Sequence, residues 1–251
     1  MPAWRAFRDE LDRFTEAGRE ARFWWRDDDA GAATPALERL IGLRRTLGVP
    51  LAVAVVPARL EPAAAHLVAE DGIEVLQHGF DHANHAGPGD KKIELGGACR
   101  PARALDLLKQ GLARLAGRTR VLPVLVPPWN RIAEALVGRL SGAGYRGLSR
   151  FGPRARPELA GLALVNAHID VIDWHGHRGH VGDETALGVA VAHLGACRAG
   201  QRDADEPVGL MTHHAAHDEA SWRFVERFAA LVGEHPRARW ISASEAFGIA
   251  A

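Results

Sequence analysis

Residues 73–82 read IEVLQHGFDH and join an apolar run to a pair of histidines. The run from Ile73 to Leu76 has the length and composition of a buried strand, so His78 and His82 follow the point where that strand ends. The two histidines are four residues apart, and one helical turn brings such a pair to the same face. Two imidazoles can bind a divalent ion, but they leave its charge and coordination incomplete. We therefore expect a carboxylate from another segment.

The sequence RDDDA at 26–30 is the expected source of that carboxylate, because it also follows an apolar run, at 23–25. Three adjacent carboxylates repel one another unless a cation or an arginine neutralises them. In an extended chain Asp27 and Asp29 point one way and Asp28 the other, and a turn after them can bring two carboxylates to one centre. One can then ligate a metal while its neighbour takes a proton from water. The competing interpretation is an acidic turn or a helix N-cap.

Strand-like apolar runs alternate with amphipathic helical segments along the whole chain. This order predicts an α/β fold with a mostly parallel sheet, and about eight candidate strands favour a closed barrel over a doubly wound sheet. Because no linker is evident, we expect residues 1–251 to form a single domain, with residues 1–20 as an N-terminal helix packed on the barrel. The polar clusters follow the strands, where such folds place their sites. The expected strands are 22–26, 51–56, 73–77, 121–126, 145–149, 164–172, 208–211 and 240–241, and the expected helices are 3–18, 35–47, 61–70, one from Pro101, 132–140, 184–198 and one around 222–232.

Composition excludes several classes of function. The 251 residues contain 31 Lys and Arg and 31 Asp and Glu, so the formal net charge of zero predicts no nucleic-acid or membrane partner. The two cysteines are far apart, which favours a reduced compartment and a metal site without cysteine. The N-terminus lacks the apolar core of a signal peptide, so we expect a cytoplasmic protein. The sequence leaves the oligomeric state open.

The chain resembles the polysaccharide deacetylase family, also called carbohydrate esterase family 4 or NodB-like. The resemblance covers about residues 22–215 and rests on four ordered motifs: RDDDA at 26–30, HGFDH at 78–82, VPPWN at 126–130 and LMTHH at 210–214. It implies a distorted (β/α) barrel of seven or eight strands and a divalent metal, usually zinc. It also implies the metal-dependent removal of an acetyl group from an N-acetylated sugar or sugar conjugate, which would be a small-molecule or glycan substrate.

The resemblance also assigns roles around the metal. Asp29, His78 and His82 would be the metal ligands, and Asp28 would be the general base. The alternative register, with Asp28 as ligand and Asp27 as base, stays open.

Further roles fall on the later motifs. Pro127, Pro128 and Trp129 would shape the acetyl pocket, with the Trp129 backbone N–H helping to hold the oxyanion. Asn130 would also bind the substrate. His213 would be the general acid, with His214 as the competing choice. Trp174 would stack on a sugar ring or line the pocket, or else would simply pack in the core.

The sequence departs from the family pattern at three points. Val126 stands where the family often has an arginine that contacts the base, and Arg26 or Arg131 is a candidate substitute. Gly79 replaces the usual Ser or Thr after the first histidine. Family members that act on polymers are typically exported, so the absence of an export signal favours a small or intracellular substrate.

Other interpretations remain at this point. The same fold and metal can act on a non-sugar amide, and a non-catalytic relative can bind glycan or metal. Two histidines and a carboxylate also suit an iron(II) oxygenase, but the regular β/α alternation argues against the double-stranded β-helix that such a protein would need. His175, His177 and His180 could form a second metal site, although we interpret them as loop residues.

Overall fold

A computed structural model describes residues 2–118 and 120–250. Residues 1, 119 and 251 of the expected single domain lie outside the described part. The strands are β1 (Ala21–Ala30), β2 (Leu51–Val55), β3 (Ile73–His78), β4 (Val121–Val126), β5 (Gly147–Leu148), β6 (Glu158–Leu159), β7 (Leu162–Leu164), β8 (Ile169–Asp170), β9 (Val208–Thr212) and β10 (Ala238–Trp240). The α-helices are α1 (Pro2–Glu16), α2 (Pro35–Leu47), α3 (Pro62–Leu67), α4 (Pro101–Leu115), α5 (Glu134–Val137), α6 (Asp183–Arg198), α7 (Glu219–Glu234) and α8 (Ala243–Phe247).

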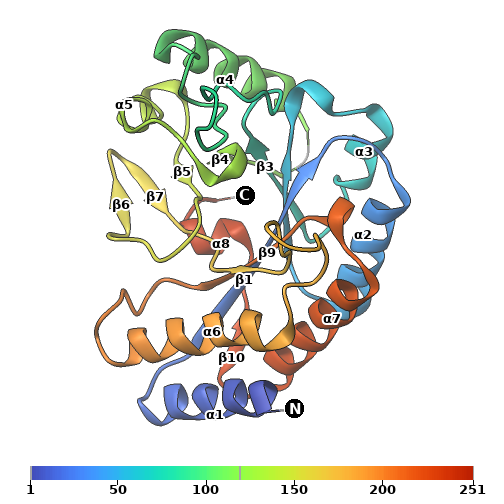
Figure 1. Cartoon of the computed structure of the whole chain (residues 1–251), viewed down its shortest axis with the longest axis vertical. Coiled ribbons are helices and arrows are strands. Elements are labelled where there is room, and N and C mark those ends of the chain that lie inside the picture. The colour runs from blue at the N-terminus through green and yellow to red at the C-terminus, as the bar shows by residue number, and fades with distance from the viewer. Residues whose placement is uncertain (1, 119, 251) are drawn as a thin grey trace.

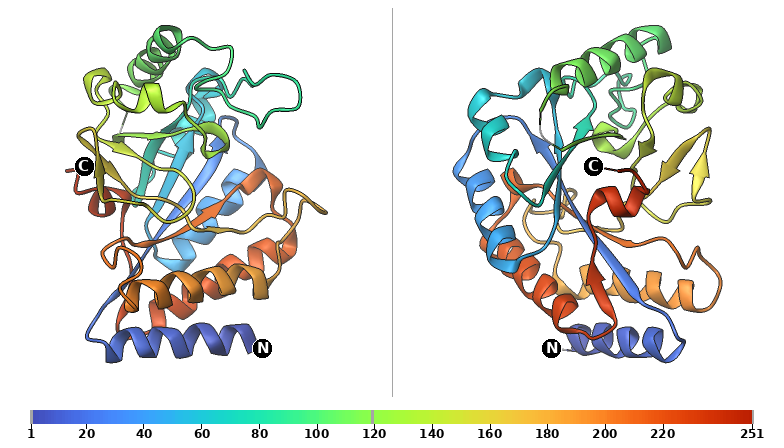
Figure 2. Two further views of the ribbon diagram at one scale, coloured as in Figure 1. Left: turned by 60° about the vertical axis from the view of Figure 1, so that its left-hand side comes forward. Right: turned by 180° about the vertical axis from the view of Figure 1, so that it is seen from behind.

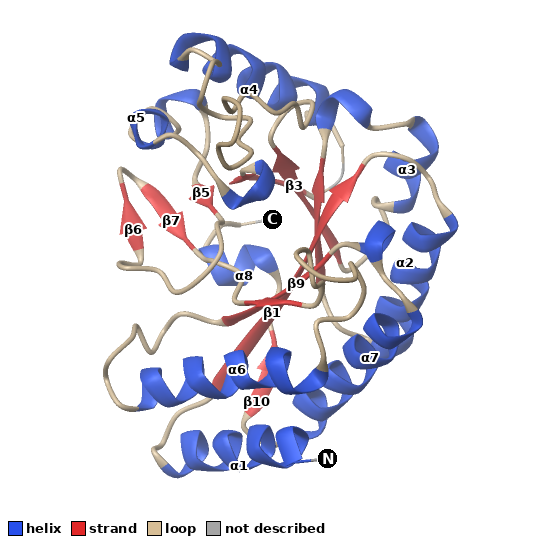
Figure 3. Cartoon of the chain, in the orientation of Figure 1, coloured by secondary structure: helices blue, strands red, loops and turns tan. Residues whose placement is uncertain are grey.

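The strands form one sheet in the order β6-β7-β5-β4-β3-β2-β1-β9-β8, and β10 pairs with β1. Every pairing is parallel except that of β6 with β7, which confirms the predicted α/β class with a mostly parallel sheet. The sheet has 10 strands rather than the seven or eight expected, because several strands of only two or three residues extend it. Helices lie outside the strands over much of the molecule (Figures 1 and 3).

The two ends of the sheet approach each other. An isolated parallel bridge joins Phe151, which follows β5, to Ala167, which precedes β8. Side chains of the central strand β1 also reach this junction. Trp24 Nε1 donates a hydrogen bond to the Asn166 carbonyl at 3.1 Å, and Arg26 Nη1 donates to Ser149 Oγ at 2.6 Å. The sheet therefore curls around the side chains on its inner face.

Alternation along β1 sorts its residues between two cores, as the period of two in a strand requires. Trp24 faces inward and packs edge-on against Phe247 of α8, which lies on the inner side of the sheet (Figure 2). Phe23 and Trp25 face outward into the larger core between the sheet and its helices. Arg26 and Asp28 continue the inward series, so this strand delivers an arginine and a carboxylate into the interior.

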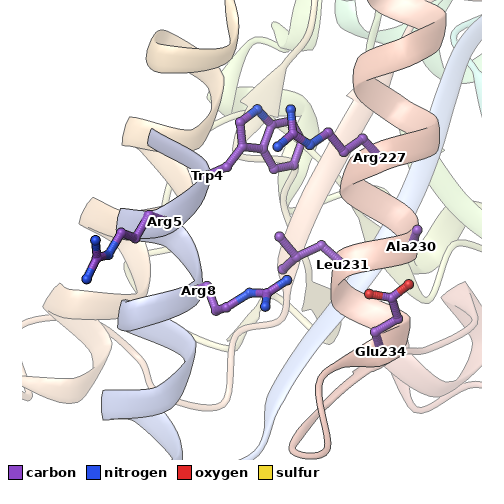
Figure 4. Close-up of a pocket in the computed structure, with 7 residues that line it drawn as sticks. All are labelled: Trp4, Arg5, Arg8, Arg227, Ala230, Leu231 and Glu234. Carbon is purple, nitrogen blue, oxygen red and sulfur yellow. The ribbon is translucent and has the colours of Figure 1, made fainter. Parts of the chain in front are cut away.

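The N-terminal helix α1 packs against α6 and α7. Its Phe7 ring stacks on Phe228 at 5.2 Å, and Trp4 Nε1 donates to Asp183 Oδ2 at 2.6 Å. The guanidinium carbon of Arg227 lies 4.2 Å from the centroid of this indole ring, beside a hollow lined by α1 and α7 (Figure 4). That hollow shares no lining residue with the cavity at the strand ends described below.

The predicted bounds of an element agree with the structure where caps are present, and they agree less closely near the junction of the two ends of the sheet. Thr34 caps α2 by accepting the Leu37 N–H, and Gly48 ends it in the left-handed conformation, as expected. The strand expected at 164–172 is divided into β7 and β8, and the helix expected at 132–140 contains only four α-helical residues, Glu134–Val137. Across residues 2–118 and 120–250, no helix is both long enough and apolar enough to cross a membrane.

Candidate active site

One carboxylate oxygen meets two imidazoles at the ends of β1 and β3. Asp29 Oδ1 lies 3.1 Å from His78 Nε2 and 3.1 Å from His82 Nε2. A bulge between Asp27 and Ala30 breaks the register of β1 with β2, and Asp29 adopts a φ of 72° there. A bulge redirects a side chain at the end of a strand, and aspartate tolerates the left-handed region better than most residues. The predicted trio is thus brought together.

The hydrogen bonds of His78 leave the correct nitrogen free for a metal. His78 Nδ1 lies 3.1 Å from the Val126 carbonyl, and since a carbonyl only accepts, Nδ1 carries the proton of the neutral ring. The lone pair of Nε2 therefore faces Asp29 Oδ1. Two such lone pairs and a carboxylate oxygen repel one another without a cation between them, so these residues fit a divalent ion.

The loop that carries His82 is organised by one buried carboxylate. Glu94 accepts the backbone N–H groups of Phe80 at 2.7 Å, Asp81 at 3.3 Å and His82 at 3.1 Å. Gly79 has a φ of 55°, and a Cβ atom there would lie 2.2 Å from Glu94 Oε2. The close approach explains why glycine stands at this position instead of Ser or Thr.

Asp28 is fully buried and is held by Arg26 from the same face of β1. Arg26 Nε lies 2.8 Å from Asp28 Oδ1, and Nη2 donates to Oδ2 at 3.0 Å. Arg26 Nη2 also donates to Asn130 Oδ1 at 2.7 Å. Val126 leaves the family's usual arginine position without a cation, and Arg26 provides the contact to this carboxylate instead. Of the two candidate substitutes, Arg131 bonds elsewhere, to the Lys92 carbonyl.

Asp27 points to the other side of the strand and has its own partners. Thr212 Oγ1 donates to Asp27 Oδ2 at 2.6 Å, and the His214 backbone N–H donates to the same oxygen at 3.0 Å. His214 Nδ1 contacts Oδ1. Burial disfavours the charged form of His214, but the charge of Asp27 and this hydrogen bond outweigh burial and raise the pKa of the imidazole. Asp27 and His214 therefore form a buried pair outside the cavity.

His213 faces the cavity beside Asp28. Its Nε2 lies 3.9 Å from Asp28 Oδ2, and the Trp174 ring meets the imidazole edge-on with centroids 4.8 Å apart. Trp174 is anchored in turn, because its Nε1 donates to Asp170 Oδ2 at 2.9 Å. Desolvation raises the pKa of the Asp170 carboxyl. The sequence analysis did not identify Asp170 as a site residue, although the segment IDVIDW that contains it ends in the predicted Trp174.

A cavity of about 960 Å³ brings most of the predicted residues together. Pro128 does not line it but packs behind it, close to Gly79, and His214 does not line it either. The predicted residues that do line it are Asp28, Asp29, His78, His82, Trp129, Asn130, Trp174 and His213. The sequence analysis assigned no role to several other lining residues, among them Lys92, Phe151, Asp170, Arg178 and Met211. Lys92, Phe151 and Arg178 lie outside the motifs, so no spacing pattern pointed to them. Met211 lies within LMTHH and Asp170 within IDVIDW, where the neighbouring residues drew the assignments.

The histidines of the β8–α6 segment have separate partners. His180 Nε2 lies 2.9 Å from Asp183 Oδ1, and His177 Nδ1 lies 3.3 Å from Asp173 Oδ2. His175 lines the cavity. Within the described residues, neither group of converging ligand atoms includes any of the three. This arrangement agrees with their interpretation as loop residues.

A second group, His168, His193 and Glu206, lies buried beneath β9 and α6. The Gly209 N–H donates to His168 Nδ1 at 3.0 Å, so the neutral ring carries its proton on Nε2, which faces Glu206 Oε1 at 3.5 Å. A nitrogen that carries a proton cannot ligate a metal. We therefore describe this group as a buried polar cluster. Burial lowers the pKa of His193 to about 4.

Comparisons with known proteins agree with this architecture. No family model matches the sequence, and no curated protein matches it significantly. Among solved structures, a putative polysaccharide deacetylase from Mycobacterium smegmatis is 14% identical with a TM-score of 0.62, over 90% of this chain and 88% of that one. The Bc1960 peptidoglycan N-acetylglucosamine deacetylase is 14% identical with a TM-score of 0.55, over 92% and 90%. A pseudoenzyme of carbohydrate esterase family 4 from Bacillus anthracis is 11% identical with a TM-score of 0.56, over 92% and 66%. The chain therefore has the fold of the polysaccharide deacetylases and esterases of carbohydrate esterase family 4.

Proposed function

We propose that this protein is a metal-dependent deacetylase of the polysaccharide deacetylase family, and that it removes an acetyl group from an N-acetylated sugar or sugar conjugate. The observation that carries the proposal is the convergence of His78 Nε2 and His82 Nε2 on Asp29 Oδ1 at the wall of a large cavity. Asp29, His78 and His82 would hold a divalent ion, for which zinc is our first choice. When bound, such an ion supplies a Lewis acid that polarises the amide carbonyl and makes water a better nucleophile.

The roles of the surrounding side chains follow from their positions. Asp28, which is paired with Arg26, accepts the proton of the attacking water. His213 donates a proton to the departing amine, and its place in the cavity supports it over His214, whose Nδ1 is occupied by Asp27. Trp129 and Asn130 shape the acetyl pocket, and the Trp129 N–H helps to hold the oxyanion.

Exposed aromatic rings support a sugar over a non-sugar amide. Phe151 is 47% exposed and Trp174 is 38% exposed, and both line the cavity. Large rings at the mouth of a polar cavity offer the flat apolar surface on which a sugar face can pack. We propose that the protein works in the cytoplasm, as the sequence predicts.

Acetate release from N-acetylated oligosaccharides tests this proposal. We expect zinc-loaded protein to release acetate and a chelator to abolish the release. Asp28→Asn should lower turnover by about a hundredfold or more while metal content stays at one ion per chain. His78→Ala should lose the metal itself. A loaded protein that binds glycan but releases no acetate would instead be a non-catalytic relative, as the pseudoenzyme neighbour is.

A further inference from the structure

Three cationic side chains line the cavity and lack a carboxylate partner. Lys92 follows β3, Arg131 follows β4 and Arg178 follows β8, so three separate segments contribute them. The ion pairs among the cavity's side chains involve Asp28 and Asp29, at the strand ends. Within residues 2–118 and 120–250, none of the three cations forms a salt bridge. Positive charges left unpaired in a concave site attract an anion.

Lys92 and Arg131 are held close together although both are cationic. Arg131 Nη1 donates to the Lys92 carbonyl at 3.0 Å, so the guanidinium is tied to the backbone of the other residue. The remaining N–H groups of this guanidinium keep the planar, two-pronged geometry that suits carboxylate and phosphate oxygens. An anion bound beside this guanidinium would also be attracted by the positive charge of the Lys92 side chain.

The acidic groups of the cavity already have partners. Asp28 is bonded to Arg26, and Asp29 faces two imidazoles that fit a divalent ion. Asp170 accepts hydrogen bonds from Trp174 Nε1 at 2.9 Å and from the Ile172 N–H at 3.0 Å. The acidic groups therefore already interact with other side chains near the strand ends. The charges that remain available to a ligand are the positive ones in the loops.

Lys92 lies within reach of the proposed metal ligands. The Trp129 ring meets His82 edge-on at 4.3 Å between centroids, and Lys92 Nζ lies 5.9 Å from the centroid of the same indole. A single tryptophan thus separates a metal ligand from the ammonium. A substituent on the acetylated sugar, or on the next sugar of a chain, can span that separation.

We infer that the substrate carries an anionic group, a carboxylate or a phosphate, on or next to the acetylated sugar, and that Lys92, Arg131 and Arg178 bind it. This inference rests on the proposed deacetylase function for its acetylated sugar. The recognised chemistry is an anionic oxygen group, and uronic acids and sugar phosphates both present one.

Kinetics with matched substrates tests the inference. N-acetylglucosamine is compared with its 6-phosphate and with a disaccharide in which it is linked to glucuronic acid. We expect kcat/KM to be about tenfold higher for at least one anionic substrate, because a charged hydrogen bond contributes about that factor. The preferred substrate identifies the source of the anion. Added salt should reduce the preference. Equal kcat/KM for all three substrates would overturn the inference.

Charge-removing variants locate the contact. Lys92→Gln and Arg178→Gln should each reduce the ratio of anionic to neutral kcat/KM several-fold. Lys91→Gln is the matched control, because Lys91 is exposed like Lys92 but does not line the cavity. A ratio that changes equally in Lys91→Gln and Lys92→Gln would exclude a specific site.

Direct binding separates this inference from the proposed function. Calorimetry with zinc-loaded protein compares a neutral glucose oligosaccharide with one of equal length that bears glucuronate, neither of which contains an amide. We expect the anionic sugar to bind about tenfold more tightly. If no substrate releases acetate but the anionic sugar still binds more tightly, the deacetylase proposal fails and the anion site stands. If both sugars bind equally and acetate is released, the reverse holds.

Discussion

Two neighbouring aspartates on β1 illustrate how a strand can give identical residues different tasks. Asp27 and Asp28 point to opposite sides of the strand, as alternation requires. Asp27 meets Thr212 and His214 in a dry environment, whereas Asp28 meets Arg26 at the cavity wall. Asp27 therefore has the contacts of a structural group, and Asp28 has those of a reactive one.

Substitution of the two aspartates should separate these tasks. In Asp27→Asn one acceptor oxygen becomes an N–H donor that faces Thr212 or His214, so a buried pair is broken and we expect a loss of about 3 kcal/mol in unfolding free energy. Turnover per folded molecule should fall far less than in Asp28→Asn. Urea unfolding, metal content and acetate release check this. Normal stability in Asp27→Asn with activity lost would make Asp27 the base and restore the alternative register.

At the scale of elements, the loop after β3 positions His82, a proposed metal ligand, through a residue outside the proposed ligand set. Glu94 binds three consecutive N–H groups that end at His82, although it lies 12 residues away in the chain. Burial raises the pKa of this carboxyl, while the backbone donors oppose that rise. The loop conformation, and with it the direction of the His82 ring, depends on this interaction.

Removal of the Glu94 carboxylate should weaken metal binding without removing a ligand. In Glu94→Ala three N–H groups lose their acceptor and His82 loses its fixed position, so we expect zinc affinity to fall about tenfold or more. Competition with a chromophoric chelator measures the affinity. Asp90→Ala is the control, since Asp90 is an exposed acid of the same loop. Unchanged affinity in Glu94→Ala would show that His82 is positioned by other contacts.

The same elements show how far sequence reasoning reaches. Apolar runs and caps predict β1, β2, β3, β4 and α2, because each element is specified by its own residues. The run 164–172 was misjudged, because it serves two strands that pair with different partners, β7 with β5 and β8 with β9. Its break is fixed by Asn166, which accepts the Arg150 N–H and donates to the Gly152 carbonyl. No periodicity within the run encodes those distant contacts.

Some residues of the candidate site could also be predicted from the sequence, whereas others could not. The proposed metal ligands follow from motif spacing, because Asp29 and His78 lie at the ends of parallel strands and His82 follows His78 after four residues. Lys92, Phe151 and Arg178 lie in loops whose course depends on the whole fold, so nothing in their local sequence marks them. The contact with Asp28 had two candidates, Arg26 and Arg131. Strand alternation places Arg26 on the same face of β1 as Asp28, whereas Arg131 follows β4 and donates to the Lys92 carbonyl.

At the scale of the whole molecule, stability depends on a cluster that the proposed chemistry does not use. His193 of α6 contacts His168 with ring centroids 4.0 Å apart, and its Nε2 lies 3.6 Å from Cys197 Sγ. The cluster joins α6 to the segment before β8 and to Glu206 before β9. Burial is the largest cause that lowers the pKa of His193 to about 4, and His168 adds to it, whereas Glu206 opposes it.

This low pKa makes the fold sensitive to mild acid. The ordinary pKa of histidine is 6.5, so below about pH 6.5 this residue binds a proton in the unfolded chain. In the folded protein His193 stays neutral until the pH falls to about 4. Stability is therefore complete above about pH 6.5 and falls as the pH decreases toward 4. Between about pH 7.5 and about pH 5 the loss from this residue should be about 2 kcal/mol.

Urea unfolding of His193→Gln at the two pH values tests the assignment. The variant cannot titrate at this position, so the difference in unfolding free energy between the two pH values should shrink by about 2 kcal/mol. It should not vanish, because burial also lowers the pKa of His217 to about 4 and that residue remains. His66→Gln, at an exposed site on α3, should leave the difference unchanged. If the unfolding free energy changes equally between the two pH values in wild type and in His193→Gln, then His193 binds the proton within the folded cluster and is charged in the folded protein.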